Sequence, residues 1–141
     1  MNRICSLVVS SILLLGLGCD SSTLADCDDL AADAAVDVYA SNPLEFRWEG
    51  ASADEVVVSR TGDGVEVWNI YVDSDDPKLL NQIESPVAYG DVPSVSEGSE
   101  LIEAQEASEL ELDVEYQVQV FIQCDDDSTV DLLATWTTAS D

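Results

Sequence analysis

The residues of this 141-residue chain with the clearest chemical potential are its four cysteines, Cys5, Cys19, Cys27 and Cys124. Cys5 lies within an apolar N-terminal stretch, and Cys19 follows that stretch directly. Cys27 and Cys124 are separated by most of the chain, whereas redox-active or metal-binding thiols are usually closely spaced, as in C-x-x-C. In an oxidising compartment a distant pair is most simply a disulfide. The sequence therefore predicts a structural Cys27–Cys124 bond.

The composition excludes several classes of function. The chain has no histidine, so Ser-His and Cys-His catalysis and histidine-containing zinc sites are ruled out. Asp and Glu number 30 against 4 Lys and Arg, for a formal charge of -26, which repels nucleic-acid phosphates. Among so many carboxylates, a pair placed for glycoside hydrolysis carries no signal. We therefore expect a non-catalytic protein with no cofactor and no nucleic-acid partner.

Three acidic clusters suggest calcium ligands, because hard oxygen ligands on loops suit this ion. The clusters are Asp26, Asp28 and Asp29; Asp73, Asp75 and Asp76; and Asp125, Asp126 and Asp127. The middle cluster does not fit an EF-hand loop, because Pro77 and Lys78 stand where a ligand and a glycine are needed. Acidic clusters in so acidic a chain are typical of solvated loops. Calcium binding is therefore only an alternative here.

The N-terminal residues are typical of an export signal. Arg3 supplies the positive charge, and an apolar core follows from Leu7 to Leu17, shorter than the roughly 20 residues of a membrane span. The sequence Leu-Gly-Leu-Gly-Cys at 15–19 resembles the lipobox of bacterial lipoproteins, although the family prefers Leu where Gly16 stands. This resemblance implies a lipoprotein signal peptide over 1–18 and lipidation of Cys19. Ordinary cleavage after Ala25 would instead release a soluble protein.

Beyond about residue 43, apolar and polar side chains alternate with the period of a half-buried strand. Strands are predicted at 44–48, 55–60, 65–72, 86–90, 115–124 and 130–138. The segment 95–109 suits a helical turn as well as a strand and is interpreted as an edge strand, and 28–38 as a tether, a short helix or a first strand. In the strand 115–124, Cys124 shares a face with Tyr116 and is predicted to point inward. The pattern predicts a single all-β sandwich.

One segment resembles a known family. Leu110-x-Leu112-Asp113-x-x-Tyr116-x-Val118-x-Val120 is similar to the segment of fibronectin type III domains in which a Leu and a Pro-Gly precede a Y-x-V-x-V strand. The resemblance implies a fibronectin type III or immunoglobulin-like sandwich over 40–141, after an acidic tether or first strand at 19–39. It also implies that the Tyr116 hydroxyl bonds the backbone upstream. Leu112 and Asp113 replace the family's Pro and Gly.

The aromatic residues allow two interpretations. Strand parity places Trp48, Trp68 and Trp136 in the core, whereas the alternative is a sugar-stacking face made of Tyr39, Trp68, Tyr71 and Tyr89. The expected function is that of an exported interaction or adhesion domain of the cell envelope, attached to a bacterial membrane through its lipid anchor, or otherwise periplasmic or secreted. Its partner would be a protein or a glycan. The alternative is a small carbohydrate- or calcium-binding module.

Overall fold

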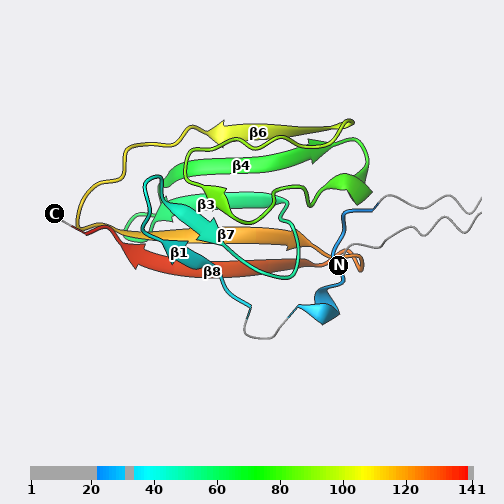
Figure 1. Ribbon diagram of the computed structural model, residues 1–141, viewed down its shortest axis with the longest axis horizontal. Coiled ribbons are helices and arrows are strands. Elements are labelled where there is room, and N and C mark those ends of the chain that lie inside the picture. The colour runs from blue at the N-terminus through cyan, green and yellow to red at the C-terminus, as the bar shows by residue number, and fades with distance from the viewer. Residues whose placement is uncertain (1–21, 31–33, 140–141) are drawn as a thin grey trace, which may run out of the picture.

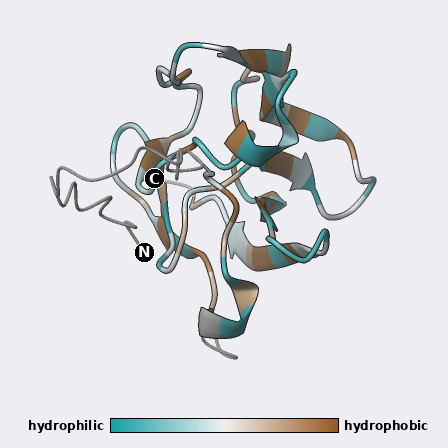
Figure 2. Ribbon diagram, turned by 90° about the vertical axis from the view of Figure 1, so that its right-hand side faces the viewer, coloured by the Kyte–Doolittle hydropathy of each residue, from teal (hydrophilic) through white to brown (hydrophobic). Residues whose placement is uncertain are grey.

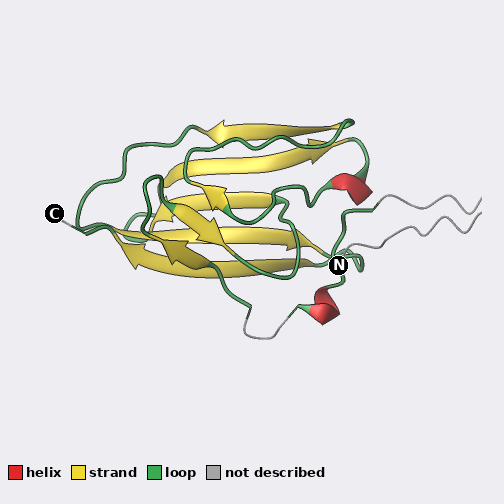
Figure 3. Cartoon of the chain, in the orientation of Figure 1, coloured by secondary structure: helices red, strands yellow, loops and turns green. Residues whose placement is uncertain are grey.

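The computed structural model describes residues 22–30 and 34–139, which form two packed β-sheets and two single-turn 3-10 helices (Figures 1 and 3). The helices are η1, Cys27–Asp29, and η2, Pro77–Leu79. The predicted signal peptide over 1–18 and the predicted lipidation site, Cys19, lie outside the described residues. The all-β sandwich predicted from the alternation of side chains is confirmed.

The smaller sheet has three short strands in the order β1-β2-β5. They are β1, Asp37–Tyr39, β2, Glu45–Arg47, and β5, Val87–Ala88. All neighbours in this sheet are antiparallel. The segment 28–38 was interpreted as a tether, a short helix or a first strand. It overlaps both a short helix and a strand, since η1 begins at Cys27 and β1 at Asp37.

The larger sheet has five antiparallel strands in the order β6-β4-β3-β7-β8. They are β3, Glu55–Arg60, β4, Glu66–Ser74, β6, Ser99–Gln105, β7, Glu115–Gln123, and β8, Thr129–Thr137. The ambiguous segment 95–109 does contain an edge strand, β6. In Figure 1 the smaller sheet lies in front of the larger one, with the N-terminal segment at the right-hand end and the C-terminal end of β8 at the left.

The core fills the space between the two sheets. Hydrophobic and hydrophilic residues alternate along the strands (Figure 2), because successive side chains of a strand point to opposite faces. In β7, Tyr116, Val118, Val120 and Ile122 are buried while the residues between them are partly exposed. Phe46 of the smaller sheet stacks on Trp68, at 6.3 Å between ring centroids, and tilts against Trp136 at 5.5 Å. This aromatic contact joins the two sheets.

The hydrogen bond implied for Tyr116 is present. Its buried hydroxyl accepts from the backbone N–H of Glu111 at 2.9 Å. Asp113, where the family has glycine, has a φ of 59°, and Asp tolerates this left-handed region better than most residues. Leu112, where the family has proline, is exposed. In the turn before β7, a residue with left-handed backbone therefore follows an exposed leucine.

Replacing Tyr116 by phenylalanine is expected to lower the free energy of unfolding by about 1 kcal/mol, because the Glu111 N–H loses its acceptor. Denaturant unfolding measures this change. Tyr71→Phe is the matched control, since the hydroxyl of the partly exposed Tyr71 has no hydrogen bond within the described part of the chain. Equal losses in the two variants would contradict the prediction.

Candidate functional site

The N-terminal segment is fixed to one end of the sandwich. Ala25 forms a parallel bridge with Cys124: its N–H donates to Gln123 O at 3.0 Å, and its carbonyl accepts from Asp125 N at 2.9 Å. Two residues earlier, the Thr23 N–H donates to the carbonyl of Lys78 at 2.7 Å. These contacts lie beside the turn between β7 and β8. We call this the tether end, defined by residues 22–29, 73–79 and 123–129.

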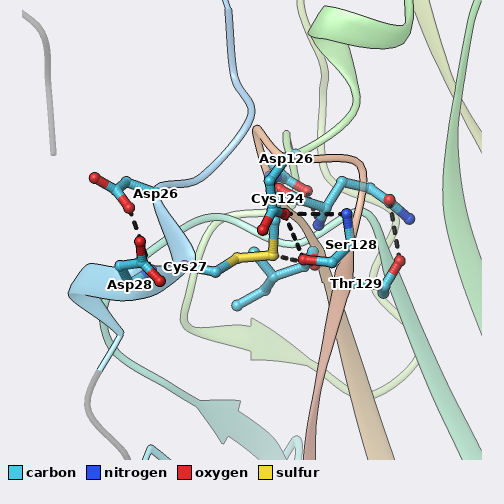
Figure 4. The surroundings of a disulfide bond; sticks show 10 residues. Asp26, Cys27, Asp28, Cys124, Asp126, Ser128 and Thr129 are labelled. Carbon is cyan, nitrogen blue, oxygen red and sulfur yellow. Dashed lines mark hydrogen bonds between the residues drawn. A yellow bond between two sulfur atoms is a disulfide. The ribbon is translucent and has the colours of Figure 1, made fainter.

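The predicted disulfide joins Cys27 of η1 to Cys124, directly after β7 (Figure 4). The two Cα atoms are 5.6 Å apart, within the range of ordinary disulfides. Cys124 is buried and faces inward, as its parity with Tyr116 predicted. The bond closes a loop that contains every strand except β8. Cys27–Cys124 is therefore a structural cross-link at the tether end.

All three acidic clusters belong to the tether end, where several of their carboxylates accept local hydrogen bonds. Asp26 Oδ1 accepts from Asp28 N, and Asp76 Oδ1 accepts from Lys78 N at the start of η2. Asp126 Oδ1 accepts from the backbone N–H and the hydroxyl of Ser128, and these bonds lower the pKa of Asp126 (Figure 4). These carboxylates therefore act as turn and helix caps.

The described residues contain no group of three or more acidic or cysteine side chains arranged to hold a metal ion. A shallow depression of about 370 Å³ does lie at the tether end. Its lining is polar and consists of Asp73, Ser74, Asp75, Gly98, Ser99 and Glu100. Ligand pockets are usually lined by apolar and aromatic side chains, which this depression lacks.

A buried amide, which the sequence analysis did not single out, holds the tether end together. Asn81 is 3% exposed, and its Oδ1 and Nδ2 bond the N–H and the carbonyl of Gln123 at 2.9 and 2.7 Å. The Gln123 side chain in turn donates to Asp54 Oδ2 at 3.2 Å. Asp54 Oδ1 is buried and has no hydrogen-bond partner among the described residues, and burial is the main cause that raises the pKa of Asp54.

Asp54→Asn is expected to raise the melting temperature at pH 7. Because the pKa of Asp54 is raised in the folded state, folding favours its protonated form, and its charged form costs stability as the pH rises through that pKa. The variant has no charge to bury, so its advantage should disappear at about pH 3, below the ordinary pKa of Asp. Melting curves at both pH values measure this. A variant that is less stable than the wild type at pH 7 would contradict the prediction.

The four aromatic residues considered for a sugar-stacking face do not share a surface. Trp68 is fully buried, and Tyr89 packs against it edge-on with ring centroids 5.4 Å apart. Tyr71, three residues after Trp68, lies on the opposite face of β4. Tyr39 is 42% exposed, and the Arg47 guanidinium lies 3.9 Å from its ring centroid. Trp48 is buried and Trp136 partly buried, so the prediction that the tryptophans belong to the core is confirmed.

Two neighbouring rows of residues on the outer face of the larger sheet carry few charges, although the chain is strongly acidic. Strand register places residues of neighbouring strands side by side in rows across this face. The aromatic row is Ile102, Tyr71, Glu55, Phe121 and Asp131, in strand order. The amide row beside it is Gln105, Asn69, Val57, Gln119 and Leu133. Glu55 is the only charged residue among the three central positions of both rows.

Glu55 is the chemically distinctive residue of this face. It is partly buried, and its two direct cross-strand neighbours are the partly exposed aromatic residues Tyr71 and Phe121. Burial is the main cause that raises the pKa of Glu55, the side-chain amide of Asn69 opposes the rise, and the charges of Asp54 and Glu66 add to it. Glu55 takes part in none of the ion pairs found among the described residues, which join Arg47 to Glu45 and Arg60 to Asp63 and Glu111.

No family model, curated protein or solved structure matches this chain. The candidate site therefore depends on the residues described above. The described residues include no helix that is both long and apolar enough to cross a membrane.

Sequence reasoning identified one cysteine pair correctly and missed the aromatic row. Tyr71, Glu55 and Phe121 are far apart in the chain and become neighbours only through the register of β3 with β4 and β7. A signal was nevertheless available, because Phe121 and Tyr71 occupy the outward-facing positions of strands that were predicted with the correct parity.

Proposed function

We propose that this protein is a non-catalytic interaction or adhesion domain of a bacterial cell envelope, anchored through a lipid on Cys19. The observation that carries the proposal is the attachment of the N-terminal segment to one end of the sandwich, by backbone hydrogen bonds and by the Cys27–Cys124 bond. A domain held in this way has a defined end next to its anchor. Its other surfaces are left available to a partner.

The length of the tether supports this geometry. Cys19 precedes Ser22, the first described residue, by three positions, which corresponds to at most about 10 Å of extended chain. A lipid on Cys19 would therefore hold the tether end close to the bilayer surface. Two or three acyl chains suffice for stable anchoring, because each buried methylene contributes about 0.8 kcal/mol. The far end of β7, nine residues long, would stand about 30 Å further out.

The disulfide supports export, because such bonds persist in oxidising compartments such as the periplasm and the cell surface. The expected compartment is the cell envelope, in accord with the charged and apolar segments that precede Cys19.

The strand order supports a fibronectin type III or immunoglobulin-like architecture. In their order across each sheet, β1, β2 and β5 take the places of strands A, B and E, and β8, β7, β3 and β4 take those of G, F, C and C′. The Tyr116 hydroxyl bond at the turn before β7 agrees with this assignment. β6 is an additional strand beside β4. Many such sandwiches serve as recognition modules, an analogy that favours binding over catalysis.

Labelling of the producing cells with a fatty-acid analogue tests the anchor. The wild-type protein is expected to incorporate the label and to fractionate with membranes, whereas Cys19→Ser should do neither. Cys5→Ser is the matched control, because it changes a cysteine within the segment that is expected to be removed. An unlabelled mature protein that begins at Asp26 would instead establish ordinary cleavage after Ala25 and would refute the anchor.

A further inference from the structure

We propose that the aromatic row on the outer face of the larger sheet binds the guanidinium group of an arginine side chain carried by a partner protein. The binding group is Glu55, with Tyr71 and Phe121 on either side of it. This proposal deepens the interaction function proposed above, on which it rests for its biological setting. The chemistry of the row does not depend on the anchor.

The three side chains supply the contacts that a guanidinium requires. Directly paired residues of neighbouring strands have Cβ atoms about 5 Å apart on the same face, so both rings flank the carboxylate. A carboxylate accepts two parallel N–H bonds from arginine, and aromatic faces attract its planar cation. Tyr71, Glu55 and Phe121 are all partly exposed, so a side chain from solvent can reach them.

The local charge favours a cation at this position. Asp54 and Glu66 add negative potential at Glu55, and neither Arg47 nor Arg60 is paired with it. A partly buried carboxylate without a counter-charge is unfavourable, and an incoming guanidinium would relieve this cost. The neighbouring amide row, with Gln119 at its centre, offers hydrogen-bonding groups to the rest of the partner.

Two other occupants fit less well. A neutral glycan can bond the amides and stack on the rings, but it brings no charge to Glu55. A second copy of this chain carries a formal charge of -26 as well, so the two molecules repel each other. An arginine side chain of a partner protein can pair with the carboxylate and stack on the rings, and its positive charge is opposite to that of this chain.

Titration of the 15N-labelled full-length protein with Nα-acetyl-arginine methylamide, followed by NMR, tests the proposal. The expected result is saturable shifts of amides around Tyr71, Glu55 and Phe121. The citrulline analogue, which has the same shape without the charge, should bind at least about five-fold more weakly. The lysine analogue, tetramethylammonium and a neutral β-1,4-linked glucose hexasaccharide are the remaining probes.

Variants distinguish binding at this site from non-specific attraction of the cationic probe to an acidic protein. Glu55→Gln should lower the affinity for the arginine probe about five-fold or more, and Phe121→Leu should lower it about three-fold. The matched control is Glu100→Gln, which removes an exposed acid from the same outer face, opposite Asp73 and outside the aromatic row. It should change the affinity less than two-fold, roughly the effect of one distant screened charge. The NMR spectrum of each variant reports whether it is folded.

Three results would overturn the assignment. Shifts centred on Asp125–Asp127 would mean that the arginine probe binds the acidic tether end instead. Equal binding of tetramethylammonium or of the citrulline analogue would refute a guanidinium site. Shifts of the same rows by the hexasaccharide, without any by arginine, would identify a glycan surface. None of these results affects the labelling of Cys19, so the anchor is tested separately.

Discussion

Replacing both Cys27 and Cys124 by alanine is expected to lower the free energy of unfolding by about 4 kcal/mol. The disulfide closes a loop of 97 residues, and a cross-link over so long a loop removes much of the conformational freedom of the unfolded chain. A domain of this size has a total stability of about 5–15 kcal/mol, so the variant should lose between about a quarter and four fifths of it. Denaturant unfolding, monitored by tryptophan fluorescence, measures the loss.

Two controls separate the effect of losing the disulfide from the effect of replacing the cysteine side chains. Wild-type protein unfolded in the presence of a reductant should match the double variant, because both lose the same cross-link. Cys27→Ala alone leaves a buried thiol at Cys124, which behaves as a small apolar side chain, so it should cost about as much as the double change. A double variant within 1 kcal/mol of the wild type would contradict the predicted loss of about 4 kcal/mol.

Phe46→Ala is expected to cost about 4 kcal/mol of unfolding free energy, the range for a large aromatic residue in a packed core. Phe46 is fully buried, belongs to the small sheet and contacts both Trp68 and Trp136 of the larger one. Its loss opens a cavity between the sheets, where strands of three residues or fewer have little else to hold them. The stability loss is measured by denaturant unfolding.

The same substitution on the other side of the larger sheet gives a matched control. Phe121 lies partly exposed on the outer face, so Phe121→Ala should cost less than about 1.5 kcal/mol. Phe46→Leu keeps most of the buried volume and should fall between the two. Equal losses for Phe46→Ala and Phe121→Ala would mean that the contact between the sheets is not where the core gains its stability.

The long strands could be predicted from sequence because one of their faces is buried. In β7 and β8, period-two alternation gave the correct inward residues, including Tyr116 and Leu132. In β3, by contrast, Val56, Val57 and Val58 are all buried, so alternation alone does not separate its faces. On the outer face Val57 is paired with Asn69 and Gln119 of the neighbouring strands, and this pairing depends on the register of the sheet.

The order of the strands in the sheets could not be predicted from the sequence. β5 has only two residues, and its pairing with β2 joins segments about 40 residues apart through Glu45 and Ala88. Nothing local specifies such a partner, because short strands are selected by the packing of the whole sandwich. For the same reason the structural role of Asn81 could not be predicted. Its side chain forms hydrogen bonds with the backbone of Gln123, which is distant in the sequence. The disulfide was predictable because cysteine chemistry leaves few choices in a chain with so few thiols.

The disulfide also determines how the molecule would respond to mechanical tension. When the chain is pulled from its two ends, the force passes from residues 22–27 through the sulfur atoms into Cys124 and β8. Residues 28–123 are bypassed and cannot extend, although unravelled they would span roughly 300 Å. Only the peptide outside the closed loop can lengthen. The enclosed strands, including those that carry Glu55, Tyr71 and Phe121, are thereby shielded from stretching, which would suit the adhesion function proposed above.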